Sequence, residues 1–217
     1  MNVLDKLLEY IFPPICGICG RIGDNNICDS CYNDIKKFEK NILIKYNSKY
    51  YSEYLYIFKY EGIIRDKIIN YKFNDKSYLY RMFVEILLRN NKVVKFIKQY
   101  DLVIPVSISA KRMKERGYNQ CELIAKEISK RLDIQTDNKL LEKRLDNKPQ
   151  SSLNKTERID NVKNVYIINK EKINLIKNKK VLIFDDIYTT GSTVNEISKV
   201  LKQNGASNIG VITLAKD

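Results

Sequence analysis

The chain has 217 residues, of which 44% are hydrophobic, and a formal net charge of +13. This length suits one α/β domain of ordinary size with a small accessory unit, and the hydrophobic content excludes an intrinsically disordered chain. No apolar run approaches the roughly 18–20 residues that span a bilayer, so we expect no membrane span. The chain has no His, which removes the commonest general base and metal ligand.

The first twelve residues predict a short amphipathic helix. Charged residues interrupt their apolar pattern, whereas a secretory signal peptide needs an uninterrupted apolar stretch and a small-residue cleavage site. We therefore expect a cytoplasmic protein. The apolar residues at helical spacing are Val3, Leu4, Leu7, Leu8 and Ile11.

Two pairs of cysteines follow, Cys16-x-x-Cys19 and Cys28-x-x-Cys31. Four thiolates satisfy tetrahedral zinc and leave no position open, which is typical of a structural site. The metal would supply folding energy to a unit too small for a core of its own. Two disulfides or four buried thiols are the alternatives, and a reducing cytosol disfavours disulfides. Cys121 begins a predicted helix, and we interpret it as a small packed residue.

The next part of the chain predicts a linker, a strand and two helices. Residues 38–49 are rich in Lys and Asn and are interpreted as the linker. Residues 50–60 alternate and are rich in Tyr and Ile, as in a strand. Apolar residues at helical spacing predict helices over residues 63–71 and 77–98. We divide the chain into a zinc module, residues 1–45, and a larger domain, residues 46–217.

From residue 101 onward, short apolar strands alternate with helices. This order favours parallel pairing with right-handed crossovers. The predicted fold class is α/β, with an open and mostly parallel sheet flanked by helices. The strands are predicted at residues 101–106, 140–141, 165–168, 179–185 and 208–215, the helices at 121–132 and 192–204, and a basic loop at 110–119.

The most informative segment is VLIFDDIYTTGST, residues 181–193. Four apolar residues predict a buried strand, and Asp185 and Asp186 follow at its carboxyl end, where open α/β sheets bind ligands. Gly191 lets the backbone turn before a helix, whose first N–H groups and dipole favour a phosphate dianion. Further hydroxyl donors to the same phosphate oxygens are Thr189, Thr190, Ser192 and Thr193.

The carboxylates of Asp185 and Asp186 can accept hydrogen bonds from two neighbouring sugar hydroxyls, so this layout fits a ribose 5-phosphate. The thirteen residues resemble the signature of type I phosphoribosyltransferases, which hold 5-phosphoribosyl-1-diphosphate (PRPP). A strand with an acidic end followed by an N-capped helix is the alternative. One departure is Thr189, because purine-salvage members of that family have an Asp there for the incoming base. This departure puts a purine-salvage reaction in doubt.

A basic segment follows the strand predicted at residues 101–106. It places Lys111, Arg112, Lys114 and Arg116 within six positions, where the resemblance puts a diphosphate-binding loop. Arg contacts phosphate through two parallel bonds and Lys acts as a point charge. We predict Lys111 and above all Arg116 as PRPP contacts, because Gly117 lets the chain turn there. A solvated basic loop is the alternative.

A polar, interrupted segment spans residues 149–162. It resembles the flexible loop that closes over the ligand in this fold and would exclude water from a reacting centre. A surface loop with a helical turn is an equal alternative.

The cysteine module, residues 60–72 (YEGIIRDKIINYK), residues 116–120 (RGYNQ) and residues 185–193 together resemble the ComF family. The resemblance covers essentially the whole chain. It implies a C-terminal part similar to amidophosphoribosyltransferases. It also implies a role in the uptake of single-stranded DNA by transformable bacteria, alongside a membrane-associated competence helicase.

Two functions of different classes follow from this resemblance. As an enzyme, the protein would bind PRPP with Mg²⁺ and lose diphosphate when a nucleophile attacks C1 of the ribose. Its catalytic residues would be Asp185, Asp186 and Arg116, although no residue is a convincing proton acceptor for a nucleobase. As a non-catalytic module, it would bind single-stranded DNA through basic residues and exposed Tyr, which the net charge permits.

Overall fold

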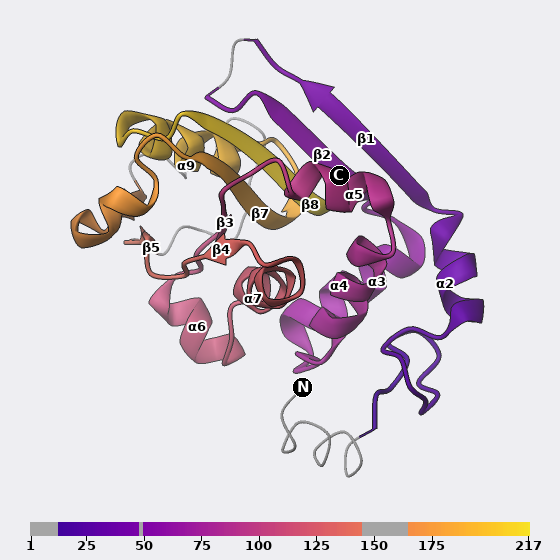
Figure 1. The fold of residues 1–217 in the computed structure, drawn as a ribbon. Coiled ribbons are helices and arrows are strands. Elements are labelled where there is room, and N and C mark those ends of the chain that lie inside the picture. Colours follow the sequence, from indigo (N-terminus) through magenta and orange to yellow (C-terminus); the bar gives the residue numbers. More distant parts are fainter. Residues whose placement is uncertain (1–12, 48–49, 145–164) are drawn as a thin grey trace.

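The computed structural model describes residues 13–47, 50–144 and 165–217 (Figure 1). A six-stranded sheet with the order β1-β2-β8-β7-β3-β4 forms the centre of this part of the chain. All neighbouring strands are parallel except the antiparallel pair β1 and β2. The open, mostly parallel sheet is therefore confirmed. The strands are β1 (Glu39–Lys45), β2 (Glu53–Lys59), β3 (Leu102–Pro105), β4 (Gln135–Thr136), β7 (Lys180–Tyr188) and β8 (Asn208–Lys216).

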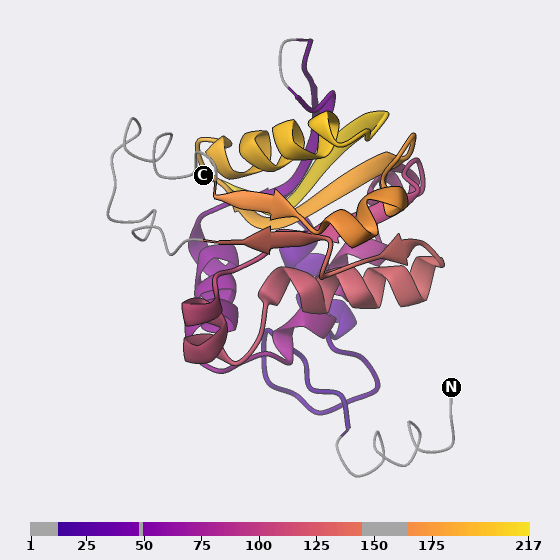
Figure 2. The same cartoon turned by 90° about the vertical axis from the view of Figure 1, so that its left-hand side faces the viewer.

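Helices cover both faces of this sheet (Figures 1 and 2). Helix α9 lies on one face, and α3, α4 and α7 lie on the other. The two central strands, β7 and β8, are almost entirely buried, as expected for parallel strands between two helical layers. The helices are α2 (Asp29–Lys36), α3 (Gly62–Phe73), α4 (Leu79–Leu88), α5 (Asn91–Ile97), α6 (Ala110–Arg116), α7 (Gln120–Leu132) and α9 (Ser192–Gln203), with the 3-10 helix η2 at Lys170–Leu175.

The linker predicted at residues 38–49 is wrong, because residues 39–45 form the edge strand β1. Its backbone pairs with β2, with Ile44 opposite Tyr54 and an irregular register between Glu39 and Ile42. An edge strand with one neighbour leaves many side chains exposed, which explains its polar composition. The predicted division at residue 45 falls between β1 and β2 and stays a prediction.

Two further expectations need correction. The single helix predicted over residues 77–98 is two helices, because Asn90 ends α4 and caps α5 by accepting from the backbone N–H of Lys92 and Val93. The basic loop predicted at 110–119 contains helix α6. Ser109 caps α6 by accepting from the N–H of Arg112, and Gly117 ends it with φ +77°.

A separate two-stranded antiparallel sheet consists of β5 (Leu141–Lys143) and β6 (Tyr166–Ile168). These strands confirm the strand candidates at residues 140–141 and 165–168. The helix predicted in residues 1–12 and the loop at 149–162 lie outside the described residues. Within the described part of the chain, no helix is long and apolar enough to cross a lipid bilayer.

Candidate functional site

The strand order of the sheet has a topological switch point between β3 and β7. From β3 the chain moves outward to the edge strand β4 and then returns on the other side of β3 as β7. Open α/β sheets bind ligands at the carboxyl end of the strands at such a point. Asp185 and Asp186 lie toward the carboxyl end of β7, one and two residues beyond the pairing of Phe184 with Pro105 of β3. The fold therefore places the acid pair where a ligand is expected.

The turn after β7 approaches its own strand closely. Gly191 has φ +79° and is the N-cap of α9. A Cβ at this position would overlap the hydroxyl group of Tyr188, so only glycine fits without movement. The Thr190 and Ser192 hydroxyls lie 2.7 Å apart, and Thr189 and Thr193 are half-buried. Gly191 has no side chain to cap α9, and the Ser192 N–H at the start of the helix lies 3.4 Å from the Thr190 hydroxyl.

Asp186 is buried, with only 3% of the residue exposed, and both of its carboxylate oxygens are bonded. Lys72 Nζ of α3 donates to Oδ1 over 2.9 Å, and Gln120 Nε2 of α7 donates to Oδ2 over 2.7 Å. Two charge-assisted bonds from two helices therefore fix the orientation of this carboxylate. Its partners in this structure are protein groups.

Asp185 lies in a different environment. It is half-buried, and its Oδ1 accepts the backbone N–H of Asp186 over 2.9 Å and faces the Cys121 sulfur at 3.7 Å. Burial, and next the Asp186 carboxylate, raise the pKa of Asp185 to about 7, although the Lys72 ammonium opposes this. Asp185 is therefore an acceptor whose charge changes near neutral pH.

Arg116 reaches the acid pair through Gln120. Its Nη1 donates to Gln120 Oε1, and its guanidinium lies 5.2 Å from the centre of the Phe73 ring. Burial lowers the pKa of Arg116, while the Asp186 carboxylate partly opposes this. Lys111, on the same helix, is exposed. The structure thus connects Arg116, Gln120, Asp186 and Lys72 in one polar chain, which Lys111 does not join.

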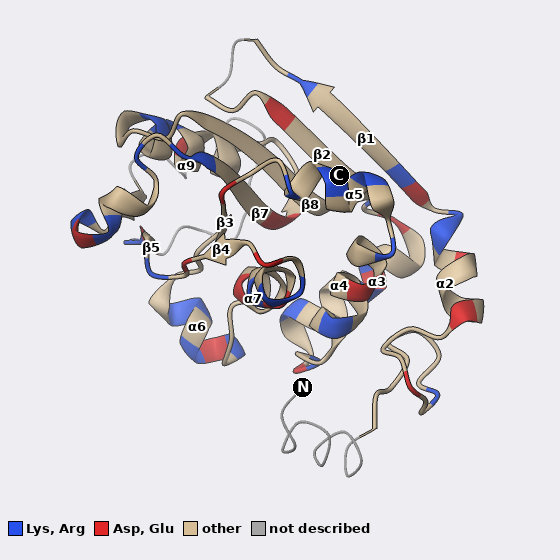
Figure 3. Ribbon diagram, in the orientation of Figure 1, with Lys and Arg blue, Asp and Glu red and all other residues tan. Residues whose placement is uncertain are grey.

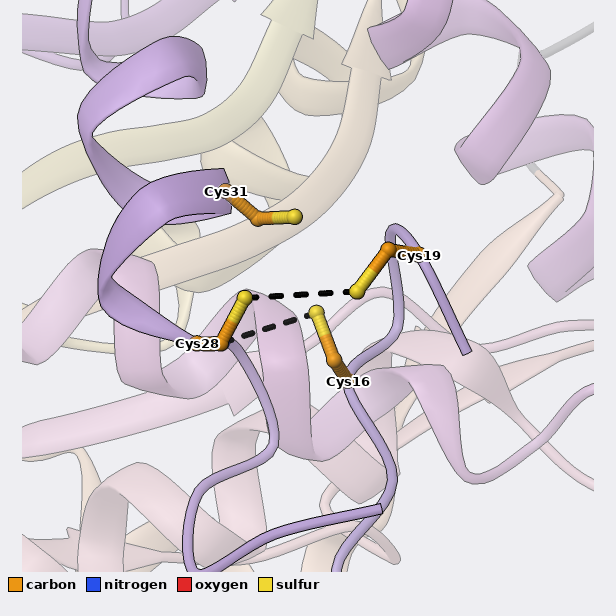
Figure 4. Close-up of side chains that lie close together, drawn as sticks. All are labelled: Cys16, Cys19, Cys28 and Cys31. Atoms are coloured by element: carbon orange, nitrogen blue, oxygen red, sulfur yellow. Dashed lines mark hydrogen bonds between the residues drawn. The ribbon is translucent and has the colours of Figure 1, made fainter. Parts of the chain in front are cut away.

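The four N-terminal cysteines converge on one point (Figure 4). All four Sγ atoms lie within 4.8 Å of one another, and none forms a disulfide. The Cys19 and Cys28 sulfurs are 4.0 Å apart, close to the ~3.8 Å edge of a tetrahedron with Zn–S bonds of about 2.3 Å. The set therefore fits a tetrahedral metal ion.

The backbone around Cys16 favours the thiolate form of this residue, whereas burial and the neighbouring thiols raise the pKa of Cys31. Burial raises the pKa of Cys16, but hydrogen bonds from the backbone of Cys19, Cys28 and Ile18 outweigh it, and the pKa falls to about 6. The Cys28 N–H lies 3.5 Å from the Cys16 sulfur. Thiolates are the form of cysteine that binds metals.

Comparison with known proteins identifies the family. Competence protein F of Haemophilus influenzae is 30% identical over 208 residues, which are 94% of this chain and 85% of that protein. The chain belongs to the ComF family.

Further relatives support the ComF assignment. Competence protein ComFC of Streptococcus pneumoniae is 33% identical over 74% of this chain and 66% of its own length. DNA utilization protein YhgH of Escherichia coli O157:H7 is 31% identical over 54% of this chain and 49% of its own length. Residues 119–217 match the phosphoribosyl transferase domain. The type I phosphoribosyltransferase class of fold, with an N-terminal four-cysteine cluster, is therefore confirmed for this ComF chain.

Sequence reasoning assigned no role to Lys72 or Gln120, although both lie in the segments that carry the ComF resemblance. Lys72 is near the end of α3 and Gln120 is the first residue of α7. A signal for Gln120 existed in the RGYNQ segment that precedes the helix. Nothing local in the sequence links Lys72 to Asp186, since 114 residues separate them.

Cys121 is fully buried in the hydrophobic core, as expected for a packed residue. Burial, followed by the carboxylates of Asp186 and Asp185, raises its pKa well above the usual value. The thiol is therefore neutral, and it packs beneath the Asp185 carboxylate as a weak donor.

Proposed function

We propose that this ComF-family protein binds PRPP, as its Mg²⁺ complex, at residues 185–193 and takes part in DNA uptake in the cytoplasm. The observation that carries the proposal is the arrangement at the carboxyl edge of the sheet, where an acid pair near the end of β7 is followed by a glycine turn and the start of α9. The competence and DNA-utilization names of the relatives support the cellular role.

In this proposal each part of the site contacts one part of the ligand. The 5-phosphate occupies the turn, where α9 N–H groups and the hydroxyls of Thr189, Thr190, Ser192 and Thr193 donate to it. Asp185, whose Oδ1 accepts from the backbone N–H of Asp186, accepts a hydrogen bond from a hydroxyl group of the ribose. Arg116 and Lys111 of α6 face the diphosphate, and bound Mg²⁺ neutralises part of the diphosphate charge.

Catalysis is a further step of the proposal. A nucleophile would attack C1 of the ribose as diphosphate leaves, and the transition state would carry positive charge on the sugar, so positioning supplies most of the rate. A screen of nucleobases and amines for diphosphate release measures turnover directly. Release with one acceptor supports an enzyme, and no release with any acceptor supports a binding protein.

We also propose zinc as the metal of the cysteine cluster. Four thiolates and no open position match the donor set that structural zinc prefers. The protein would fill all ligand positions of this ion, so the ion would stabilise the fold and would have no position open to a substrate.

A second candidate function is the binding of single-stranded DNA. Phe73 is 66% exposed and Tyr78 is 47% exposed, and the cationic side chains of Lys111 and Lys114 are exposed on α6 (Figure 3). Exposed rings beside cations can stack bases and hold the phosphate backbone. Strand affinity should then fall steeply with salt, because bound counterions are released. A flat salt dependence would remove this candidate.

Titration calorimetry with Mg²⁺–PRPP tests the first proposal. We expect binding to the unmodified chain and a loss of about tenfold or more in Asp185→Asn, because the variant loses a charge-assisted hydrogen bond. Asp101→Asn, a change at the opposite end of the strands where Asp101 accepts from the Lys180 N–H, is the matched control and should bind normally. Equal affinity in all three proteins would place the ligand elsewhere.

A further inference from the structure

The two carboxylates of the acid pair differ in how far protein groups already bind their oxygens. Asp186 is bonded at Oδ1 by Lys72 and at Oδ2 by Gln120, and its side chain is 5% exposed. Asp185 has its Oδ1 within bonding distance of the Asp186 N–H and the Cys121 thiol, while Oδ2 has no hydrogen-bond partner among the described residues. Asp185 therefore has a carboxylate oxygen without a hydrogen-bond partner among the described residues. The Asp186 oxygens keep further lone pairs, but the side chain of Asp186 is almost fully buried.

Freeing Asp186 for a ligand would be costly. The side chain of Lys72 is only 18% exposed, and breaking a buried ion pair leaves an uncompensated charge on each side. A sugar hydroxyl is a neutral donor, so its bond to Asp186 would be weaker than the bond from an ammonium. Gln120 is itself held by Arg116 at its carbonyl oxygen and by the Tyr71 hydroxyl at its backbone carbonyl, so it does not turn away easily.

Lys72, which binds Asp186, comes from a separate part of the chain. Lys72 belongs to α3, outside residues 119–217 that match the phosphoribosyl transferase domain. Two hydrogen bonds hold helix α3 near Lys72. Lys67 donates to the Ile18 carbonyl over 3.0 Å, and the Tyr118 hydroxyl donates to the Tyr71 carbonyl. The ammonium of Lys72 is therefore a built part of the site.

We propose that Lys72 stays bonded to Asp186 when a ligand binds, so that the site recognises one ring hydroxyl of the sugar instead of two. This inference rests on the proposed function and deepens it by naming the ligand class. Sugar phosphates that lack one ring hydroxyl, the deoxyribose 5-phosphates, then belong to the ligands of this site together with ribose 5-phosphate. Lys72 is a positioning residue for this specificity, since it acts through Asp186.

A panel of three sugars tests this on the unmodified full chain. Calorimetry is run with ribose 5-phosphate, 2-deoxyribose 5-phosphate and 3-deoxyribose 5-phosphate. A hydroxyl that donates to a carboxylate contributes about tenfold to a hundredfold in affinity. If one carboxylate serves the ring, at least one deoxy sugar should bind within about fivefold of ribose 5-phosphate. If both deoxy sugars are weaker than that, both acids read hydroxyls and the inference is overturned.

The panel separates this inference from the proposed function. Binding of ribose 5-phosphate with loss of both deoxy sugars overturns the single-hydroxyl inference and leaves the site in place. Failure of all three sugars and of PRPP overturns the proposed site itself and with it this inference. Binding of PRPP with failure of all three sugars leaves the site in place and overturns this inference, because ribose 5-phosphates are then not its ligands.

A variant pair tests the role of Lys72. Lys72→Met frees Asp186 Oδ1, so ribose 5-phosphate should gain over the better deoxy sugar by about tenfold. Lys95→Met, at an exposed position of α5, removes an equal charge away from the acid pair and should leave the ratio unchanged. An unchanged ratio in Lys72→Met would show that this lysine does not set the preference. The three-sugar panel remains decisive if that variant fails to fold.

Discussion

Asp185 and Asp186 are neighbours in the sequence but have different surroundings in the fold. Asp186 points toward α3 and α7, where Lys72 and Gln120 bind it. Asp185 faces the buried Cys121 thiol at the start of α7, and an oxygen of each carboxylate lies within 4.8 Å of the Cys121 sulfur and of the other carboxylate. One carboxylate is thereby compensated by a cation, and the other carries the cost of burial.

This difference predicts a pH dependence of ligand binding. Because the pKa of Asp185 is raised to about 7, its carboxylate is mostly protonated at pH 6 and mostly ionised at pH 8. The ionised form is the better acceptor for a ligand hydroxyl, so affinity for ribose 5-phosphate should rise by up to about tenfold from pH 6 to pH 8. Calorimetry across this range measures the change.

The ligand phosphate also titrates, with a pKa of about 6. Asp185→Asn is therefore the control, because it keeps the phosphate contribution and loses that of the side chain. The profile of the variant should be shallower than that of the unmodified chain. Two profiles of the same shape would mean that Asp185 does not accept from the ligand.

At the scale of elements, α3 and α4 connect the cysteine module to the sheet. Glu85 of α4 accepts the Asn26 backbone N–H over 3.0 Å and the Arg89 guanidinium over 2.7 Å. Arg89 also binds Asp29 at the start of α2. A Cβ at Gly17 would come within 2.6 Å of the Met82 sulfur, so the first cysteine knuckle packs directly on α4. These contacts hold the four-cysteine cluster in place from outside the module.

Glu85→Leu should weaken metal binding as well as folding. The change leaves the Asn26 N–H without its acceptor and the Arg89 guanidinium with Asp29 alone, at a cost of about 1–3 kcal/mol. Urea unfolding measures the stability, and competition with a chelating dye measures the metal affinity. Glu127→Leu on α7 is the control, because its ion pair with Arg131 is long and partly exposed and contributes little. Equal metal affinity in both variants would show that α4 does not support the module.

The elements that were predicted from the sequence are those with a local pattern. The apolar run of β7 and the helical spacing of α7 and α9 lie within single segments, and all three are confirmed. The edge strand β1 was missed because its apolar pattern is weak and its pairing with β2 comes from another segment. Helix α6 was missed although Ser109 and Gly117 mark its ends, since its basic composition suggested a loop.

The candidate site shows the same division. The turn at Gly191 and the convergence of four cysteines follow from spacing along the chain, and the structure contains both. The bond between Lys72 and Asp186 joins a helix, α3, to a strand, β7, and only the tertiary fold brings these two segments together. Sequence reasoning therefore located the acid pair but could not show that one of its members is occupied by a lysine.

At the scale of the whole molecule, the cysteine module and the sheet share one hydrophobic core. Cys16, Ile27 and Ile35 are buried and belong to the same cluster as the strands and helices of the larger domain. A unit of this size has little core of its own. Folding of the module and folding of the sheet should therefore be coupled.

Metal removal tests this coupling. Structural zinc typically contributes about 10–16 kcal/mol to a small module, so stripping the ion should lower the Tm of the whole chain by about 10 °C or more in a single calorimetric transition. Returned Zn²⁺ should restore the Tm. Cys31→Ser should reproduce the loss, whereas Cys121→Ser, at a buried thiol outside the cluster, should keep its full zinc content. A separate low-temperature transition beside an unchanged main one would instead show that the module unfolds alone, as an independent division at residue 45 requires.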